Sequence, residues 1–81
     1  MDITYDQKYN VAYIRLRKKT AKGEIETMRV SDELYIDISP DGKVYGIELL
    51  NAKEQLSLMH GSQFIFKNES SGKSIKVPVP A

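Results

Sequence analysis

The sequence predicts an α+β fold: a mainly antiparallel sheet of hairpins or a meander, with one short helix packed on it and a C-terminal β-hairpin. Three observations predict it. Apolar and polar residues alternate in several short segments, turn-forming pairs separate these segments, and a single short helical pattern follows residue 50. Because 81 residues are too few for two hydrophobic cores, we expect one domain over 1–81, with the sheet and helix in 1–60 and a hairpin extension in 61–81.

The N-terminal segment predicts two strands joined by a turn. Ile3-Thr4-Tyr5 begins the first strand, and Asp6 to Asn10 is a polar connector whose Asp and Asn favour turns. In residues 11–17 the even positions are apolar and Arg15 and Arg17 are basic, which is typical of a half-buried strand. We therefore expect a hairpin here, followed by a basic loop that ends at Gly23.

The middle of the sequence predicts three more strands. Residues 25–30 contain β-branched side chains, and residues 34–38 alternate clearly. Ser39-Pro40-Asp41-Gly42-Lys43 is the strongest turn signal, because proline presets the first corner and Asp-Gly readily adopts positive φ. It should connect the fourth strand to an antiparallel partner at 44–50, in which Tyr45, Ile47 and Leu49 point to one side.

A short helix and a second hairpin complete the prediction. Asn51 is suited to cap a helix over 52–59, with His60 and Gly61 at its end, where the imidazole can interact with unpaired carbonyl groups. Strands are expected at 63–67 and 73–77, and the prolines that follow place the last strand at an edge.

These strand phases predict a hydrophobic core on one face of the sheet. Aspartate at Ile36 should unfold the protein, because an unpaired buried charge costs several kcal/mol. The expected core residues are Ile14, Leu16, Met28, Val30, Leu34, Ile36, Ile38, Ile47, Leu49 and Leu56.

Composition excludes several functional classes. The formal net charge of +1 provides no strong field for nucleic acid or anionic membranes, and the absence of cysteine excludes disulfides, thiolate metal sites and thiol nucleophiles. No apolar run approaches the length of a spanning helix, and residues 1–3 do not begin a signal peptide. We expect a cytoplasmic protein without a cofactor, metal site or membrane segment.

Three stretches of the chain resemble the small prokaryotic family known as domain of unknown function 2283. The resemblance covers residues 3 to about 56, with Asn10 and Asn51 at positions where the family often has aspartate. It implies a strand-rich domain with a short helix and, because members are sometimes encoded beside small toxin-like proteins, an antitoxin-like or other partner-binding role. The matching stretches are Tyr5-Asp6 with residues 11–16, residues 34–37 with 41–44, and residues 46–52.

The polar face of the predicted sheet is the candidate functional surface. Tyrosine and arginine are enriched at protein interfaces, so this face predicts a dimer or a docking surface for a small protein. A solvated face with weak cross-strand ion pairs is the competing interpretation. The residues are Tyr13, Arg15, Arg17, Arg29, Tyr35, Asp37 and Glu48.

Two alternatives come from other functional classes. Asp37 and Glu48 on one face could serve a small carboxylate-dependent hydrolase or a ligand-binding protein, although the pattern supplies no third catalytic element and a structural ion pair with arginine is favoured. The basic 17–22 loop, with Lys18, Lys19 and Lys22, could contact nucleic acid weakly. A non-enzymatic interaction module remains the leading hypothesis.

Overall fold

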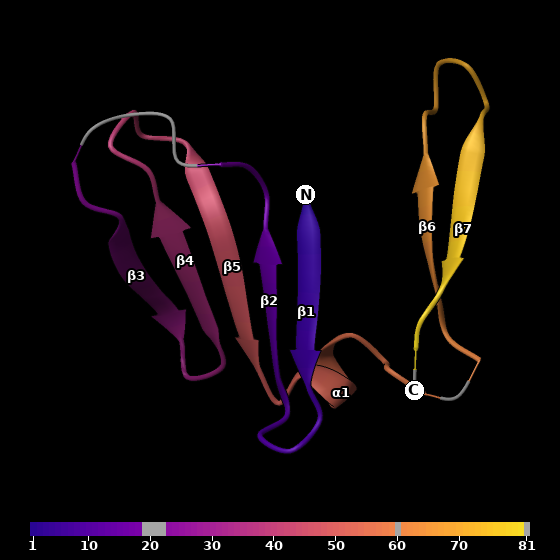
Figure 1. The fold of residues 1–81 in the computed structure, drawn as a ribbon, viewed down its shortest axis with the longest axis horizontal. Helices are drawn as coiled ribbons and strands as arrows, with labels where there is room; N and C mark the ends of the chain where they lie inside the picture. Colours follow the sequence, from indigo (N-terminus) through magenta and orange to yellow (C-terminus); the bar gives the residue numbers. More distant parts are fainter. Residues whose placement is uncertain (19–22, 60, 81) are drawn as a thin grey trace.

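The chain folds into a five-stranded antiparallel sheet, a short helix and a separate two-stranded hairpin. The computed structural model describes residues 1–18, 23–59 and 61–80, and the element order is drawn in Figure 1. This confirms the predicted α+β class. The elements are β1 (Asp2–Asp6), β2 (Val11–Arg15), β3 (Glu26–Ser31), β4 (Leu34–Ile38), β5 (Val44–Leu50), α1 (Ala52–Gln55), β6 (Gln63–Lys67) and β7 (Ser74–Pro78).

The strand order in the large sheet is β1-β2-β5-β4-β3, with every pair antiparallel. Three hairpins supply most of the pairs, but β5 returns to lie beside β2, so the sheet is more than a simple meander. Register shifts mark irregularities in β3 between Arg29 and Ser31 and in the β4–β5 pair at Asp37 and Ile38. Such bulges re-aim side chains and increase the local twist.

The predicted turns form through local hydrogen bonds. The Asp6 carboxylate accepts from the backbone N–H of Lys8 at 2.9 Å and of Tyr9 at 3.2 Å, closing the β1–β2 turn. Between β4 and β5, the Gly42 N–H donates to the Ser39 carbonyl at 2.8 Å, and Gly42 has a φ of 82°. Both connectors therefore use the residue types that favour turns in the sequence.

Strand register gives the sheet one apolar and one polar face, because directly paired residues point to the same side. Across the middle of the apolar face runs an unbroken row of directly paired residues, one from each strand, which we call the isoleucine row. Its members, in spatial order, are Ile3, Ile14, Ile47, Ile36 and Met28. The opposite face carries the predicted polar residues, so the strand phases inferred from the sequence are correct over these positions.

The helix is shorter than predicted, ending at Gln55 where the pattern indicated Met59. Asn51 has a φ of 53° and makes no side-chain cap hydrogen bond. It does not cap the helix as expected. The segment 52–58 covers only one end of the apolar face, where Ala12, Ala52 and Leu58 are the buried apolar residues of the described chain.

The buried core is smaller than predicted. Met28 and Val30 are 50% and 54% exposed, and the other predicted core residues are only partly buried. The helix is too short to cover the sheet. Within the described residues, β2 is the one strand against which α1 packs closely. Most of the apolar face is consequently open. The prediction that Ile36→Asp unfolds the protein assumes a buried Ile36, but Ile36 is only partly buried in one chain.

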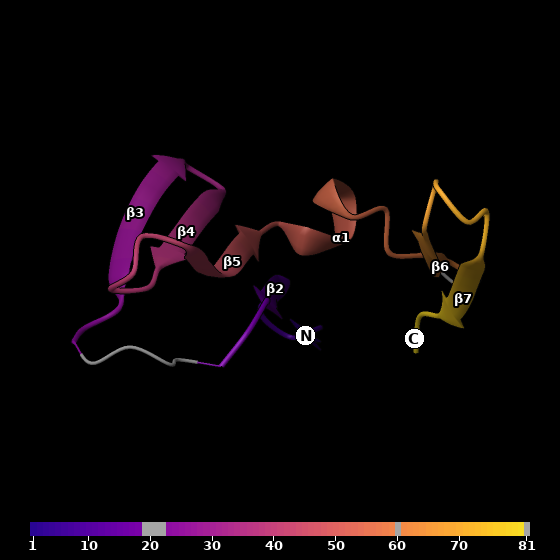
Figure 2. The same cartoon turned by 90° about the horizontal axis from the view of Figure 1, so that it is seen from above.

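The β6–β7 hairpin stands apart from the large sheet. Figures 1 and 2 place it beyond α1 on the β1 side, and it forms a sheet of its own. Pro78 ends β7, opposite Gln63, as expected for an edge position. The molecule has a radius of gyration of 14.4 Å, against about 11.7 Å for a compact domain of this length.

Candidate functional site

The polar face brings together six of the seven residues predicted to form the interaction surface. One directly paired row contains Tyr13, Glu48, Tyr35 and Arg29, and the adjacent row contains Arg15 and Asp37. Arg17 does not join them, because it lies two residues beyond the end of β2. The arrangement predicted from alternation is therefore present, but its residues are extensively bonded to one another.

Tyr13 is the central residue of this face. Its ring extends from β2 across Gly46 of β5 to β4, where its hydroxyl donates to a carboxylate oxygen of Asp37 at 2.6 Å. A Cβ at Gly46 would lie 2.1 Å from the Tyr13 hydroxyl oxygen, so glycine leaves the space that the ring occupies. Thr27 of β3 donates to the other Asp37 oxygen at 2.6 Å. Tyr13, Gly46, Asp37 and Thr27, which we call the Tyr13 network, thus link four strands.

The Tyr13 network stabilises the protonated form of the Tyr13 phenol. Burial raises the pKa of the Tyr13 phenol well above its ordinary value, and the hydrogen bond and negative charge of Asp37 raise it further. A phenol held in this form is a hydrogen-bond donor rather than a base at neutral pH. The environment therefore suits Tyr13 to a structural role.

The arginines are also engaged. Arg15 pairs with Asp2 across β1 and β2, and Arg29 pairs with Asp32. The hydrogen bond that Arg15 donates to the Asp2 carboxylate raises the pKa of Arg15. Both pairs are exposed, so each contributes little to stability.

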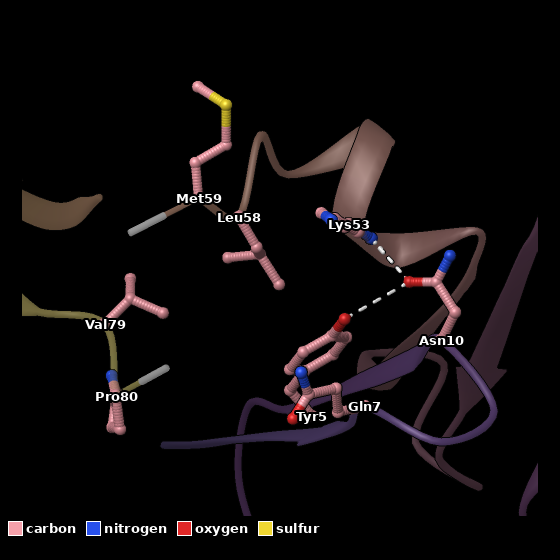
Figure 3. Close-up of a pocket in the computed structure, with 8 residues that line it drawn as sticks. All are labelled: Tyr5, Gln7, Asn10, Lys53, Leu58, Met59, Val79 and Pro80. Carbon is pink, nitrogen blue, oxygen red and sulfur yellow. Dashed lines mark hydrogen bonds between the residues drawn. The ribbon is translucent and has the colours of Figure 1, made fainter. Parts of the chain in front are cut away.

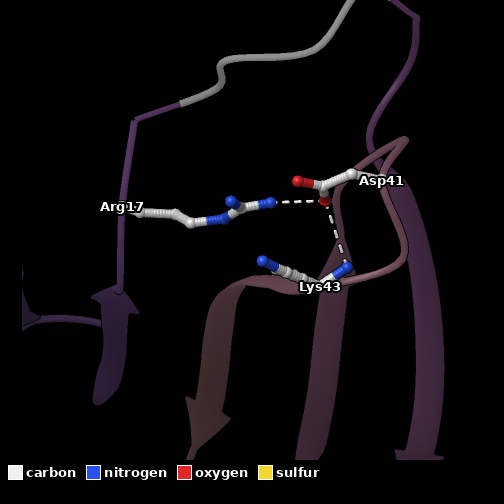
Figure 4. A network of polar contacts seen from close by, with 3 residues as sticks. All are labelled: Arg17, Asp41 and Lys43. Atoms are coloured by element: carbon white, nitrogen blue, oxygen red, sulfur yellow. Dashed lines mark hydrogen bonds and ion pairs between the residues drawn. The ribbon is translucent and has the colours of Figure 1, made fainter.

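Arg17 makes an ion pair at the end of the sheet. It reaches Asp41 in the β4–β5 turn, and Asp41 also accepts from the Lys43 backbone N–H at 3.1 Å (Figure 4). These bonds lower the pKa of Asp41, with that from Arg17 contributing most. Arg17 therefore holds the chain after β2 against the turn.

The regular pairing of β4 with β5 is interrupted at Tyr45. The irregularity in the β4–β5 pair aligns Ile38 with Val44 and Asp37 with Gly46, leaving Tyr45 between two paired positions. Alternation along β5 therefore does not decide to which face the Tyr45 side chain points. A bulge of this kind cannot be seen in simple alternation.

The geometry offers little to the carboxylate hypothesis. Asp37 and Glu48 share the polar face, but both Asp37 oxygens accept structural hydrogen bonds. Neither carboxylate lines the two pockets that lie beside β1 and the segment after α1. Among the described residues, no group of three or more histidine and carboxylate side chains is placed to hold a metal ion.

Two other predictions fall on positions that the structure does not describe. His60, expected at the helix end, lies outside the described residues, as do Lys19 and Lys22 of the basic loop. Lys18 is described and exposed. Within the described chain, no helix is long and apolar enough to cross a membrane.

Asn10 holds the helix in place, although its sequence pattern predicts only a turn. Its side-chain oxygen accepts from the Lys53 N–H at 2.8 Å and from the Tyr5 hydroxyl at 3.4 Å (Figure 3). Its amide nitrogen donates to Asn51 at 3.1 Å and to Glu54 at 3.2 Å. Asn10 therefore performs the capping that was expected of Asn51, from 41 residues away in sequence.

Asn10 also borders an open pocket of about 680 Å³ between β1, α1 and the start of the C-terminal tail (Figure 3). Leu58, Met59 and Val79 form its apolar side. A smaller cavity of about 210 Å³ lies nearby, where Ile3 and Ala12 of the sheet meet Phe64 of the hairpin. The apolar face of the sheet thus opens toward the hairpin.

Comparison with known sequences places these features in a family. The pattern of the family described as "Protein of unknown function (DUF2283)" matches residues 2–53. The chain belongs to the DUF2283 family. The matched region contains all five strands of the large sheet, the Tyr13 network and Asn10, whereas the β6–β7 hairpin lies outside it.

A relative supports this membership. The "Uncharacterized protein YuzE" of Bacillus subtilis is 33% identical over an alignment of 78 residues, and this alignment covers 93% of this chain and 60% of YuzE. The chain therefore spans less than two thirds of the length of this relative. No solved structure matches the chain.

Proposed function

We propose that this DUF2283 protein is a non-enzymatic protein-interaction module, and that the apolar face of its five-stranded sheet is the binding surface. The open isoleucine row carries the proposal. Four isoleucines and a methionine pair directly across all five strands, and α1 covers only one end of this face. An uncovered, charge-free row of this length is typical of a surface that another polypeptide covers.

The exposed area supports the same proposal. The chain exposes 6443 Å², whereas a compact folded protein of this mass exposes about 4,900 Å². The excess is comparable with the surface that a specific protein–protein interface buries. Association through the apolar face would bury part of this excess and supply the core that the single chain lacks.

The polar face is the alternative binding surface, because tyrosine and arginine favour interfaces. The bonds of Tyr13, Arg15 and Arg29 to neighbouring carboxylates favour the apolar face instead, since a partner at the polar face would have to compete with them. An antitoxin-like role, with a small protein as the partner, is the more specific form of the proposal.

Thiol footprinting tests which face is covered. The chain has no cysteine, so a single introduced cysteine reports its own accessibility. Met28→Cys and Thr27→Cys place it at adjacent positions of β3, on the apolar and polar faces respectively, and both positions are exposed in one chain. Each variant is alkylated with a maleimide in concentrated native-host lysate and again after purification and dilution.

We expect Cys alkylation in the Met28 variant to be about tenfold slower in lysate than in dilute solution, with little change in the Thr27 variant. The reverse pattern would place the partner on the polar face. Equal reactivity of both variants under both conditions would overturn the proposed function.

A further inference from the structure

The β6–β7 hairpin has an apolar face of its own. Direct pairing places Phe64 opposite Val77 and Phe66 opposite Ile75, so four apolar side chains share one side. Phe66 and Ile75 are 67% and 65% exposed. Because an isolated two-stranded hairpin is marginally stable in water, this face also needs something to pack against.

The two apolar faces meet at the 210 Å³ cavity. Phe64 of the hairpin lines it together with Ile3 and Ala12 of the sheet. The apolar sides of the sheet and the hairpin are therefore continuous there, and together they form the two walls of one open, apolar surface.

We propose that a second copy of this chain occupies this surface by reciprocal arm exchange. The β6–β7 hairpin of each copy packs its exposed apolar residues Phe66, Ile75 and Val77 over the isoleucine row of the other, while Phe64 stays at the cavity beside its own β1. The inference rests on the proposed function and names its partner. Two-fold symmetry makes the exchange self-complementary, since each copy contributes one sheet and one hairpin.

Hydrogen bonds at the base of the hairpin favour a second copy over the chain's own sheet. The Ser62 hydroxyl donates to the Ser57 carbonyl at 2.8 Å and accepts from the Met59 N–H at 2.9 Å. The Val79 N–H donates to the Ser62 carbonyl at 2.9 Å. Folding the hairpin onto its own sheet by bending the chain between Ser57 and Ser62 would break the two bonds of the Ser62 hydroxyl. The sheet of a second copy can approach without disturbing them.

The exposed area fits a dimer. Each chain exposes about 1,500 Å² more than a compact protein of its mass. Two chains together have about 3,000 Å² to bury, which lies within the range of obligate homodimers. The isoleucine row and the four-residue apolar side of the hairpin carry no charged side chain, so these two surfaces of identical copies meet without repulsion. Glu26, paired with Ile38, lies on the outermost strand at one end of the sheet face.

Sedimentation and light scattering of the full chain provide the first test. We expect a dimer in the wild type and at least about a 100-fold higher dissociation constant for Phe66→Asp. Ile65→Asp is the matched control, because Ile65 is the preceding residue of β6, is 61% exposed and points to the other side. It should remain dimeric, and circular dichroism checks that both variants stay folded.

A disulfide between copies provides the second test. Ile36→Cys and Ile75→Cys are prepared separately, one with an isotopic label, then mixed, allowed to exchange and oxidised. Arm exchange predicts a covalent dimer containing one labelled and one unlabelled chain.

The outcomes separate this inference from the proposed function. If the wild type stays monomeric, the proposal that a second copy is the partner is overturned. Protection of Met28→Cys in lysate would then still support a different partner. A dimer that tolerates Phe66→Asp and gives no mixed disulfide overturns arm exchange but not association.

Discussion

The two faces of the five-stranded sheet differ in how far their side chains find partners within one chain. On the polar face, Tyr13, Asp37 and Thr27 satisfy one another, and Arg15 and Arg29 each have a carboxylate partner. On the apolar face, the isoleucine row has only a short helical segment at one end. One chain is sufficient to organise the polar face but not to bury the apolar one.

This difference shows which interactions a small sheet can provide for itself. Polar side chains of neighbouring strands reach each other directly, because strands lie about 4.8 Å apart. Burial of an apolar face needs a second layer about 10 Å away, which a four-residue helix cannot supply. The following predictions test the contrast, beginning with the largest expected effect.

Ile36→Asp should have the largest effect. In the associated protein the carboxylate would be buried without a partner, which costs more than about 3 kcal/mol. In a dilute single chain the carboxylate can reach water, so the loss should be smaller there. Thermal unfolding measured across a range of protein concentrations should show a concentration-dependent melting temperature for the wild type but not for the variant.

A matched pair controls for the added charge. Ile3 and Thr4 are adjacent and exposed on opposite faces of β1. Ile3→Lys should weaken association, whereas Thr4→Lys should not. Equal effects would show that the two faces do not differ in the way proposed.

Gly46→Ala should disrupt the polar face. The new Cβ would displace the Tyr13 ring and break its bond to Asp37, at a cost of about 2 to 3 kcal/mol in unfolding free energy. Chemical denaturation provides the measurement. In a Tyr13→Val background the same change should cost less than about 0.5 kcal/mol, and a full cost in that background would contradict the role assigned to Gly46.

Asn10→Ala should cost about 2 kcal/mol, because it removes the bonds to α1 and places alanine at a φ of 56°. Asn10→Gly keeps the backbone conformation accessible and should cost only about 1 kcal/mol. The difference in denaturation midpoints separates conformational strain from lost bonds. If both variants match the wild type, Asn10 does not hold the helix.

Asp41→Asn should have the smallest effect, and it should depend on pH. Because the pKa of Asp41 is lowered in the folded state, its stabilisation is present above the unfolded value of 3.8 and is lost as pH falls through the folded pKa. The wild type should therefore melt above the variant at pH 7 and converge with it in acid. A constant difference across pH would exclude the Arg17 pair as its cause.

Alternation correctly predicted the strands and the faces of the regularly paired side chains. Asp37 and Arg15 fall on one side as expected, because the period of two depends only on the extended backbone. The bulge beside Tyr45 interrupts the phase, so alternation does not place that side chain. Asn10 was missed as a helix cap because its partner at Lys53 is distant in sequence, and local patterns do not report such contacts.

The core prediction failed for a different reason. Apolar periodicity identifies which face avoids water, but it does not reveal whether the same chain provides the cover. Met28 belongs to the apolar face, yet it is half exposed. Gly46 could have been suspected as a site of close approach, since glycine inside a strand often marks one, but the Tyr13 ring over it required the three-dimensional register.

The irregular register near Arg29 in β3 also limits aggregation. β3 is an outermost strand, and a flat, regular border would invite further strands and open-ended fibrils. The displaced pairing there, with the charged side chains of Glu26 and Arg29, works against such growth. Growth through the sheet border is thereby disfavoured, and the proposed exchange between two copies would form a closed particle of finite size.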